Sequence, residues 1–93
     1  MDPLDLLLAR LARVIRNRRT DAGYTQAEFA HAAKVFRTFM GQIERGTANP
    51  SVKTLFRIAQ VLGLSVTELF VLAAGNEGDA EPQSRPSRRK RGK

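Results

Sequence analysis

Apolar residues recur at helical spacing along most of this chain. Five stripes of 3.6-residue period predict helices over residues 3–22, 26–33, 37–45, 52–62 and 66–73. No segment of strand length alternates apolar and polar residues. The pattern therefore predicts an all-α protein of five helices.

Capping residues mark where these helices begin and end. Asp2-Pro3 pairs a good N-cap with proline at the first helical position, which opens the first helix. Thr25 with Glu28, and Ser65 with Glu68, have the spacing of capping boxes. The remaining boundaries are predicted by a fourth cap and three terminating glycines: Ser51, Gly23, Gly46 and Gly63.

The stretch 25–46, TQAEFAHAAKVFRTFMGQIERG, predicts two short helices joined by a tight turn at 34–36. Its apolar residues can bury one shared seam, made by Phe29, Ala30, Ala33, Val35, Met40 and Ile43. This burial leaves four residues on the outward face of the second helix: Arg37, Thr38, Gly41 and Gln42. Such a face suits a helix laid in the major groove of DNA.

Two features of the outer helices bear on partners. Three basic residues of the first helix lie opposite its apolar stripe, as a solvated face or a second phosphate-contacting surface, with solvation favoured: Arg10, Arg13 and Arg16. Leu6 and Leu7 lie off the centre of that stripe, and residues 69–72 of the fifth helix are all apolar. A short terminal helix cannot bury all its sides in one small core, so these residues predict a dimer surface.

Composition narrows the class of ligand. The 93 residues allow one small folded domain, expected over 1–75, and carry a net charge of +7. This basic excess indicates a polyanion, which could be DNA, RNA or an anionic membrane surface. No apolar run approaches the roughly 18–20 residues of a membrane span, and the N-terminus lacks the features of a signal peptide. The absence of cysteine excludes disulfides and thiolate metal sites.

Residues 76–93 differ sharply from the rest of the chain. They contain glycine, proline, serine and charged residues but no large apolar side chain, which predicts disorder. The segment begins acidic and ends with the basic stretch 85–93. We interpret the basic end as an arm that follows the DNA backbone, in preference to a solubilising tail, because its sign matches the proposed ligand.

Three segments, TQAEFAHAA, QIERG and NPSVKTLFRIAQVLGLSVTELF, resemble in order and spacing the lambda repressor/Cro-like helix-turn-helix (Xre) family, over about residues 8–70. The resemblance implies a five-helix DNA-binding domain with its helix-turn-helix unit at 25–46. It also implies a cytoplasmic, nucleoid-associated transcription regulator of bacterial or phage type, which binds a palindromic operator as a homodimer. No cofactor, metal, membrane or small-molecule effector is expected.

Site residues follow from the resemblance one at a time. Gln26 matches a phosphate-contacting position at a helix N-terminus, where free N–H groups and the helix dipole favour an anion. Arg37, Thr38 and Gln42 match base-facing positions, and arginine and glutamine can form paired bonds to guanine and adenine. Further backbone contacts are expected from Arg45, Thr47 and Lys53. Arg19 and Glu44 match a pair of residues that form a structural ion pair.

Three residues depart from the family pattern. Lys34 replaces the usual glycine of the turn, and lysine pays a steric penalty in the left-handed conformation, so the turn is expected to be either strained or differently shaped. Phe36 replaces the small polar cap of the recognition helix, removing a bond worth about 1 kcal/mol, and is expected to face the groove or a second subunit. Gly41 lies inside that helix at a cost of about 1 kcal/mol, and is expected to allow close approach to DNA.

Other functions have less support. An enzyme is disfavoured because the only histidine, His31, is expected on an exposed helix face without a nucleophile or metal partner. An antitoxin-like interaction module that also binds DNA is permitted by the apolar ends of the folded part. A membrane-surface binder would need the apolar stripe that the core requires. RNA binding usually involves exposed aromatic residues for stacking.

Overall fold

The computed structural model describes residues 2–75, and these form five helices and no strand: α1 (Pro3–Asp21), α2 (Gln26–Ala33), α3 (Arg37–Arg45), α4 (Val52–Val61) and α5 (Val66–Ala74). The predicted all-α, five-helix class is confirmed. The predicted disordered tail at 76–93 lies outside the described residues.

Local capping explains most helix boundaries. The Thr25 and Ser65 side chains accept from the backbone N–H groups of Glu28 and Glu68, at 3.1 and 3.0 Å. Each glutamate accepts in return from the capping residue's N–H, so both predicted capping boxes are confirmed. Asp2 caps α1 by accepting from the Asp5 N–H at 2.9 Å.

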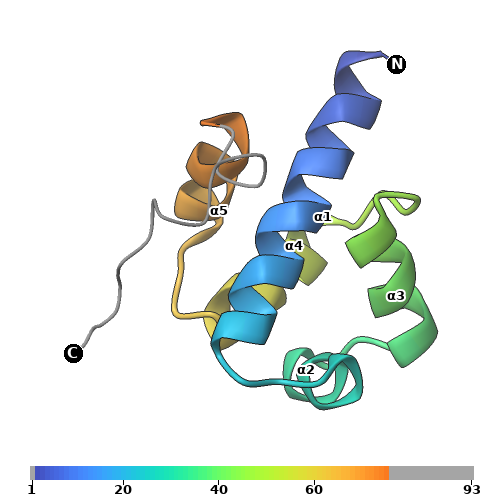
Figure 1. Ribbon diagram of the computed structural model, residues 1–93, viewed down its shortest axis with the longest axis vertical. Helices are drawn as coiled ribbons and strands as arrows, with labels where there is room; N and C mark the ends of the chain where they lie inside the picture. The colour runs from blue at the N-terminus through green and yellow to red at the C-terminus, as the bar shows by residue number, and fades with distance from the viewer. Residues whose placement is uncertain (1, 76–93) are drawn as a thin grey trace.

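The longest helix, α1, lies between α3 and α5 and contacts both of them (Figure 1). The second helix packs against α3 and α4, and α4 in turn contacts α5. Within the helix-turn-helix unit of α2 and α3, it is α3 that borders one side of α1, and α5 borders the other. This arrangement leaves α3 at the edge of the molecule.

One cluster of buried side chains joins all five helices. Its largest fully buried members are Val14, Ile15, Phe29, Met40, Ile58 and Leu69. Burying each large side chain of this kind contributes roughly 1.5–3 kcal/mol. The predicted seam between α2 and α3 is confirmed, because its members are buried except for Val35, which is half-buried against the cluster.

Some apolar residues that share the helical spacing of the predicted stripes are exposed in α4 and at the start of α1. Val52 and Phe56 are 71% and 52% exposed. They lie one turn apart on α4, beside the face that carries its buried residues, so helical spacing alone did not separate the exposed side from the buried one. Leu4 is also half exposed, because it lies in the first turn of α1, near the free end of the helix (Figure 1).

Within residues 2–75, no single helix is long and apolar enough to cross a membrane. The helices α4 and α5 together reach that length only across a bend of 92°.

Candidate nucleic-acid interface

A three-residue turn sets the angle between α2 and α3. Lys34 ends α2 in the left-handed conformation, with φ of 60° and ψ of 44°. The N–H groups of Lys34 and Val35 donate to the carbonyls of His31 and Ala30, at 3.1 and 2.9 Å. These bonds satisfy the last carbonyls of α2. Of the two outcomes expected for this turn, the structure has the left-handed lysine and not a differently shaped turn.

Phe36 is the N-cap of α3 and supplies no side-chain bond to that helix. Its carbonyl accepts from the Met40 N–H at 2.9 Å, so its backbone is fixed while its ring is 88% exposed. Arg37 and Thr38 follow in the first turn, and both are exposed. The first turn of α3 therefore presents an aromatic ring, a guanidinium and a hydroxyl to solvent.

One of the four residues expected on the outward face of α3 is buried. Gln42 is half-buried and Arg45 is exposed, but Gly41 is buried. A Cβ added at Gly41 would lie 3.3 Å from Arg45 Nη1 and 3.5 Å from Gln26 Oε1. Gly41 is therefore corrected from an outward-facing residue to one covered by two side chains. Its lack of a side chain lets Gln26 of α2 lie over α3.

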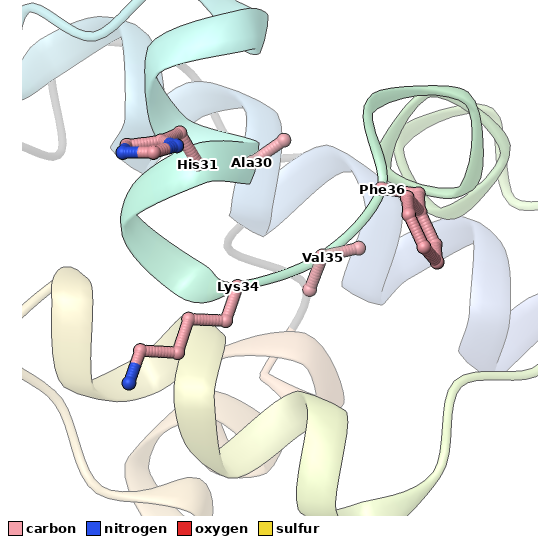
Figure 2. A pocket seen from close by; sticks show the side chains of 5 residues that line it. All are labelled: Ala30, His31, Lys34, Val35 and Phe36. Atoms are coloured by element: carbon pink, nitrogen blue, oxygen red, sulfur yellow. The ribbon is translucent and has the colours of Figure 1, made fainter.

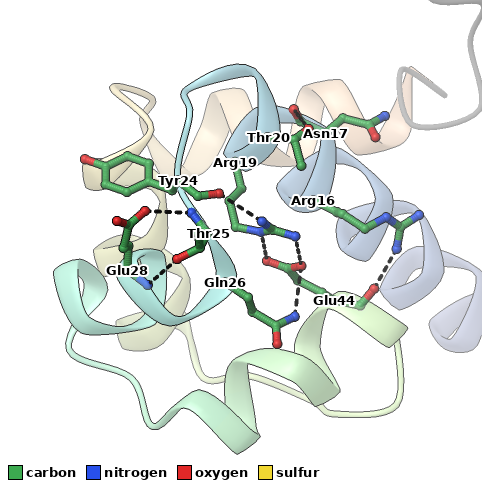
Figure 3. Close-up of polar contacts among 9 residues, drawn as sticks. All are labelled: Arg16, Asn17, Arg19, Thr20, Tyr24, Thr25, Gln26, Glu28 and Glu44. Atoms are coloured by element: carbon green, nitrogen blue, oxygen red, sulfur yellow. Dashed lines mark hydrogen bonds and ion pairs between the residues drawn. The ribbon is translucent and has the colours of Figure 1, made fainter.

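Arg19 and Glu44 form a bidentate ion pair between α1 and α3 (Figure 3). Arg19 Nε and Nη2 donate to Glu44 Oε2 and Oε1 at 2.8 and 3.0 Å, and Arg19 Nη1 donates to the Tyr24 carbonyl at 2.9 Å. Only 13% of the Arg19 side chain and 3% of the Glu44 side chain are exposed. The pair thus holds the last turn of α3 against α1.

The Gln26 side chain belongs to the same network. Its Nε2 donates to Glu44 Oε1 at 3.2 Å, which connects α2 to the ion pair (Figure 3). The amide nitrogen is therefore engaged within the protein, and only the oxygen lies over Gly41. In the first turn of α2, the Glu28 N–H donates to the Thr25 side chain. An approaching anion would therefore face the N–H groups of Gln26 and Ala27.

Arg16 is exposed, as expected for a solvated face, but it also bonds to α3. Its Nη1 donates to the backbone carbonyl of Glu44 at 2.8 Å (Figure 3). A cation at the last carbonyls of a helix satisfies an acceptor and opposes the negative end of the helix dipole. The spacing of Arg16 and Arg19, three residues apart on one helix, was the available signal for a shared partner.

The end of α3 also lies close to α1. Gly46 has φ of +76°, and a Cβ there would lie 3.3 Å from Ala9 Cα. Thr47 follows, and both its N–H and its hydroxyl donate to the Gln42 carbonyl, at 3.0 and 3.2 Å. Glycine is thus required at position 46 by backbone conformation and by the nearby α1 backbone.

The other residues predicted to contact the DNA backbone lie at or after the C-terminal end of α3. Arg45 and Thr47 are exposed, and Lys53 is exposed in the first turn of α4, beyond the loop that follows α3. The structure therefore brings Gln26, Gly41 and Arg45 together, places Arg37 and Thr38 at the opposite end of α3, and leaves Lys53 on a separate helix.

A shallow pocket of about 290 Å³ lies beside the turn, lined by Ala30, His31, Lys34, Val35 and Phe36 (Figure 2). His31 is exposed, as expected. Among residues 2–75, no three or more histidine, aspartate or glutamate side chains lie close enough together to hold a metal ion.

Known proteins match this chain over a region that includes α2 and α3. The family model described as "Helix-turn-helix" matches residues 15–69. An uncharacterised HTH-type transcriptional regulator, y4dJ of Sinorhizobium fredii, is 36% identical over 69 residues, covering 74% of this chain and 84% of that protein.

Two solved structures share this fold. The clp gene regulator ClgR from Corynebacterium glutamicum superposes with a TM-score of 0.70 and 33% identity, over 74% of this chain and 73% of its own. The protein C.Esp1396I, solved bound to a 25 base pair operator site, gives a TM-score of 0.67 and 30% identity, over 76% and 93% of the two chains.

Proposed function

This chain belongs to the helix-turn-helix family of transcriptional regulators, and we propose that it is a repressor that binds a palindromic operator in double-stranded DNA as a homodimer. The observation that carries the proposal is the first turn of α3, where Arg37 and Thr38 stand exposed on a helix braced by α1. The operator complex of the similar protein C.Esp1396I supports the same class of ligand.

Three side chains of α3 read bases in this proposal. With α3 in the major groove, Arg37 donates two bonds to guanine O6 and N7, and Gln42 pairs with adenine one turn further along. Thr38 contacts a base or a phosphate beside them. Each well-formed bidentate pair discriminates against the wrong base by about 1–3 kcal/mol.

The surrounding residues contact the phosphate backbone. The first turn of α2, beginning at Gln26, directs free N–H groups at a phosphate, while Arg45, Thr47 and Lys53 approach the strand beyond the end of α3. Gly41 contributes indirectly, because it makes room for the side chains of Gln26 and Arg45. These contacts set the orientation of α3 and carry no sequence information.

Exposed apolar side chains support a dimer surface formed by α1 and α5. Leu4 and Leu6 at the start of α1, and Val71 on α5, are each at least 40% exposed. The two helices pack together, and α5 lies on the side of α1 away from α3 (Figure 1). A dimer formed there leaves both recognition helices free to enter successive major grooves, roughly 34 Å apart on one face of the DNA.

Selection of bound sequences from a random DNA library tests this function. We expect enrichment of a palindrome whose half-sites lie about 10 base pairs apart, centre to centre. Sedimentation of the protein with and without the selected duplex then gives the number of chains on each site. A library that shows no enrichment would reject sequence-specific binding, and would favour an antitoxin-like interaction module.

A further inference from the structure

Phe36 is the most exposed large apolar residue in the described part of the chain, at 88%. Figure 2 shows its ring at the start of α3, pointing away from His31 and Lys34. It is absent from the apolar residues that pack against the core. Leaving an aromatic ring in water forgoes the free energy that its burial would contribute.

The same residue also lacks the usual local benefit of its position. Serine, threonine, asparagine or aspartate at an N-cap would accept a bond from the first turn of α3, and phenylalanine cannot. Phe36 thus gives neither capping nor core packing to the isolated domain. A contact outside the domain is the remaining use for the ring.

Its backbone is nevertheless well fixed. Val35 is half-buried and its N–H donates to Ala30, while the Phe36 carbonyl accepts from Met40. These bonds hold the Cα of Phe36 directly before Arg37, at the end of α3 that would enter the groove first. A side chain held in this way can contribute to recognition without ordering a flexible loop.

The neighbours of Phe36 identify the kind of partner. Arg37 and Thr38 directly follow it in the first turn of α3, and both are exposed. A cationic group and a hydroxyl beside one apolar side chain match the major groove, where phosphates and base acceptors surround the thymine methyl group. That methyl is the main apolar feature of the base edges in this groove, and phenylalanine is among the side chains that contact it.

We propose that Phe36 is a specificity-determining residue that contacts the 5-methyl group of a thymine beside the base pair read by Arg37. This inference rests on the proposed function, since it assumes that α3 enters the major groove. It adds an apolar contact to the three polar ones, and it predicts a required thymine in each half-site.

Replacing thymine by deoxyuridine tests the contact, because uracil lacks only the methyl group. Each thymine of one selected half-site is replaced in turn, and affinity is measured by fluorescence anisotropy. We expect about fourfold weaker binding at one position, the factor for one apolar carbon returned to water. The Phe36→Ser variant should bind both duplexes equally, whereas Phe36→Leu should retain part of the difference.

Thermal unfolding provides the control for folding. Phe36→Ser should unfold at a higher temperature than the parent chain, because serine supplies the missing cap. Lost methyl discrimination in a more stable protein cannot be ascribed to unfolding.

Three results would overturn the inference. These are a selected half-site without thymine, equal affinity for thymine and uracil at every position, or unchanged discrimination in Phe36→Ser. Each can occur while the selection still yields a palindrome, so the inference can fail alone. Absence of any enriched sequence would reject both it and the proposed function.

Discussion

Gln26 Nε2 and Arg19 Nη2 donate to the same oxygen, Glu44 Oε1, at 3.2 and 3.0 Å. One buried carboxylate therefore connects α1, α2 and α3. The ion pair expected from the sequence is more than a brace between two helices, because it also fixes the side chain that begins α2. Its geometry sets how α2 and α3 approach a DNA strand together.

Removing Arg19 should destabilise the domain strongly. Arg19→Ala leaves the Glu44 carboxylate buried without its cation, at a cost of about 3–5 kcal/mol. The double variant Arg19→Met with Glu44→Leu should lose less, since no charge is left unpaired. Urea denaturation measures the free energy of unfolding of the single and the double variant, with Asn17→Ala on the exposed side of α1 as control. A loss below about 1 kcal/mol would show that the pair behaves as a solvated surface pair.

Arg37 and Gln42 should affect specific binding selectively. Arg37→Ala and Gln42→Ala each remove a proposed base contact, and should weaken binding to the selected operator by about 1–3 kcal/mol. Binding to random duplex should change little. Anisotropy titrations on both duplexes give the ratio of operator affinity to random-duplex affinity for each variant. Gln60→Ala, on the exposed side of α4, is the matched control. Equal losses on both duplexes would contradict base reading.

Gly41→Ala should separate stability from binding. Alanine is favoured in a helix by about 1 kcal/mol, and the new methyl group meets only the ends of two flexible side chains. We therefore expect a more stable protein. Its affinity for both operator and random DNA should fall, because Gln26 and Arg45 must move.

The reverse exchange on α2, Ala32→Gly, measures helix propensity alone at an exposed site. Unchanged DNA affinity in Gly41→Ala would show that the positions of Gln26 and Arg45 do not contribute.

Lys34→Gly should relieve backbone strain. A left-handed non-glycine residue costs about 1–2 kcal/mol of stability, and glycine removes this cost. Glycine also makes the unfolded chain more flexible, which lowers the stability by about 0.4–1 kcal/mol. We expect a net gain of about 0–1.6 kcal/mol in the free energy of unfolding. Lys34→Val should instead be less stable, because a β-branched residue tolerates this conformation poorly. A less stable glycine variant would imply that the lysine side chain itself stabilises the turn.

Deleting residues 85–93 should reduce the salt dependence of DNA binding. This prediction rests on sequence alone, since these residues lie outside the described part. Each phosphate neutralised by a basic residue contributes about 0.9 to the slope of log affinity against log salt concentration. Titrations at several salt concentrations give the slope for both chains. An equal slope would show that this segment does not contact the backbone.

Local features of this fold were readable from the sequence, and long-range ones were not. The capping boxes at 25–28 and 65–68 depend on residues three apart, so their residue types suffice. Exposure of Val52 and Phe56 depends on which side of α4 meets the other helices, which spacing within α4 does not specify. The residues of the candidate site also divide into those whose conformation is local and those whose burial depends on contacts between helices. A left-handed Lys34 was one of the two outcomes expected from the sequence, but the burial of Gly41 depends on where α2 places Gln26.

The close approach of Gly46 to Ala9, together with the two arginine contacts to Glu44, limits how this unit can be transplanted. A peptide of α2 and α3 alone would lack Arg19, which pairs with the Glu44 carboxylate. It would also lack the part of α1 that contacts the end of α3. Grafting the helix-turn-helix into another scaffold therefore requires α1 from Ala9 to Arg19 as well. A portable reading unit of this protein therefore needs at least three helices.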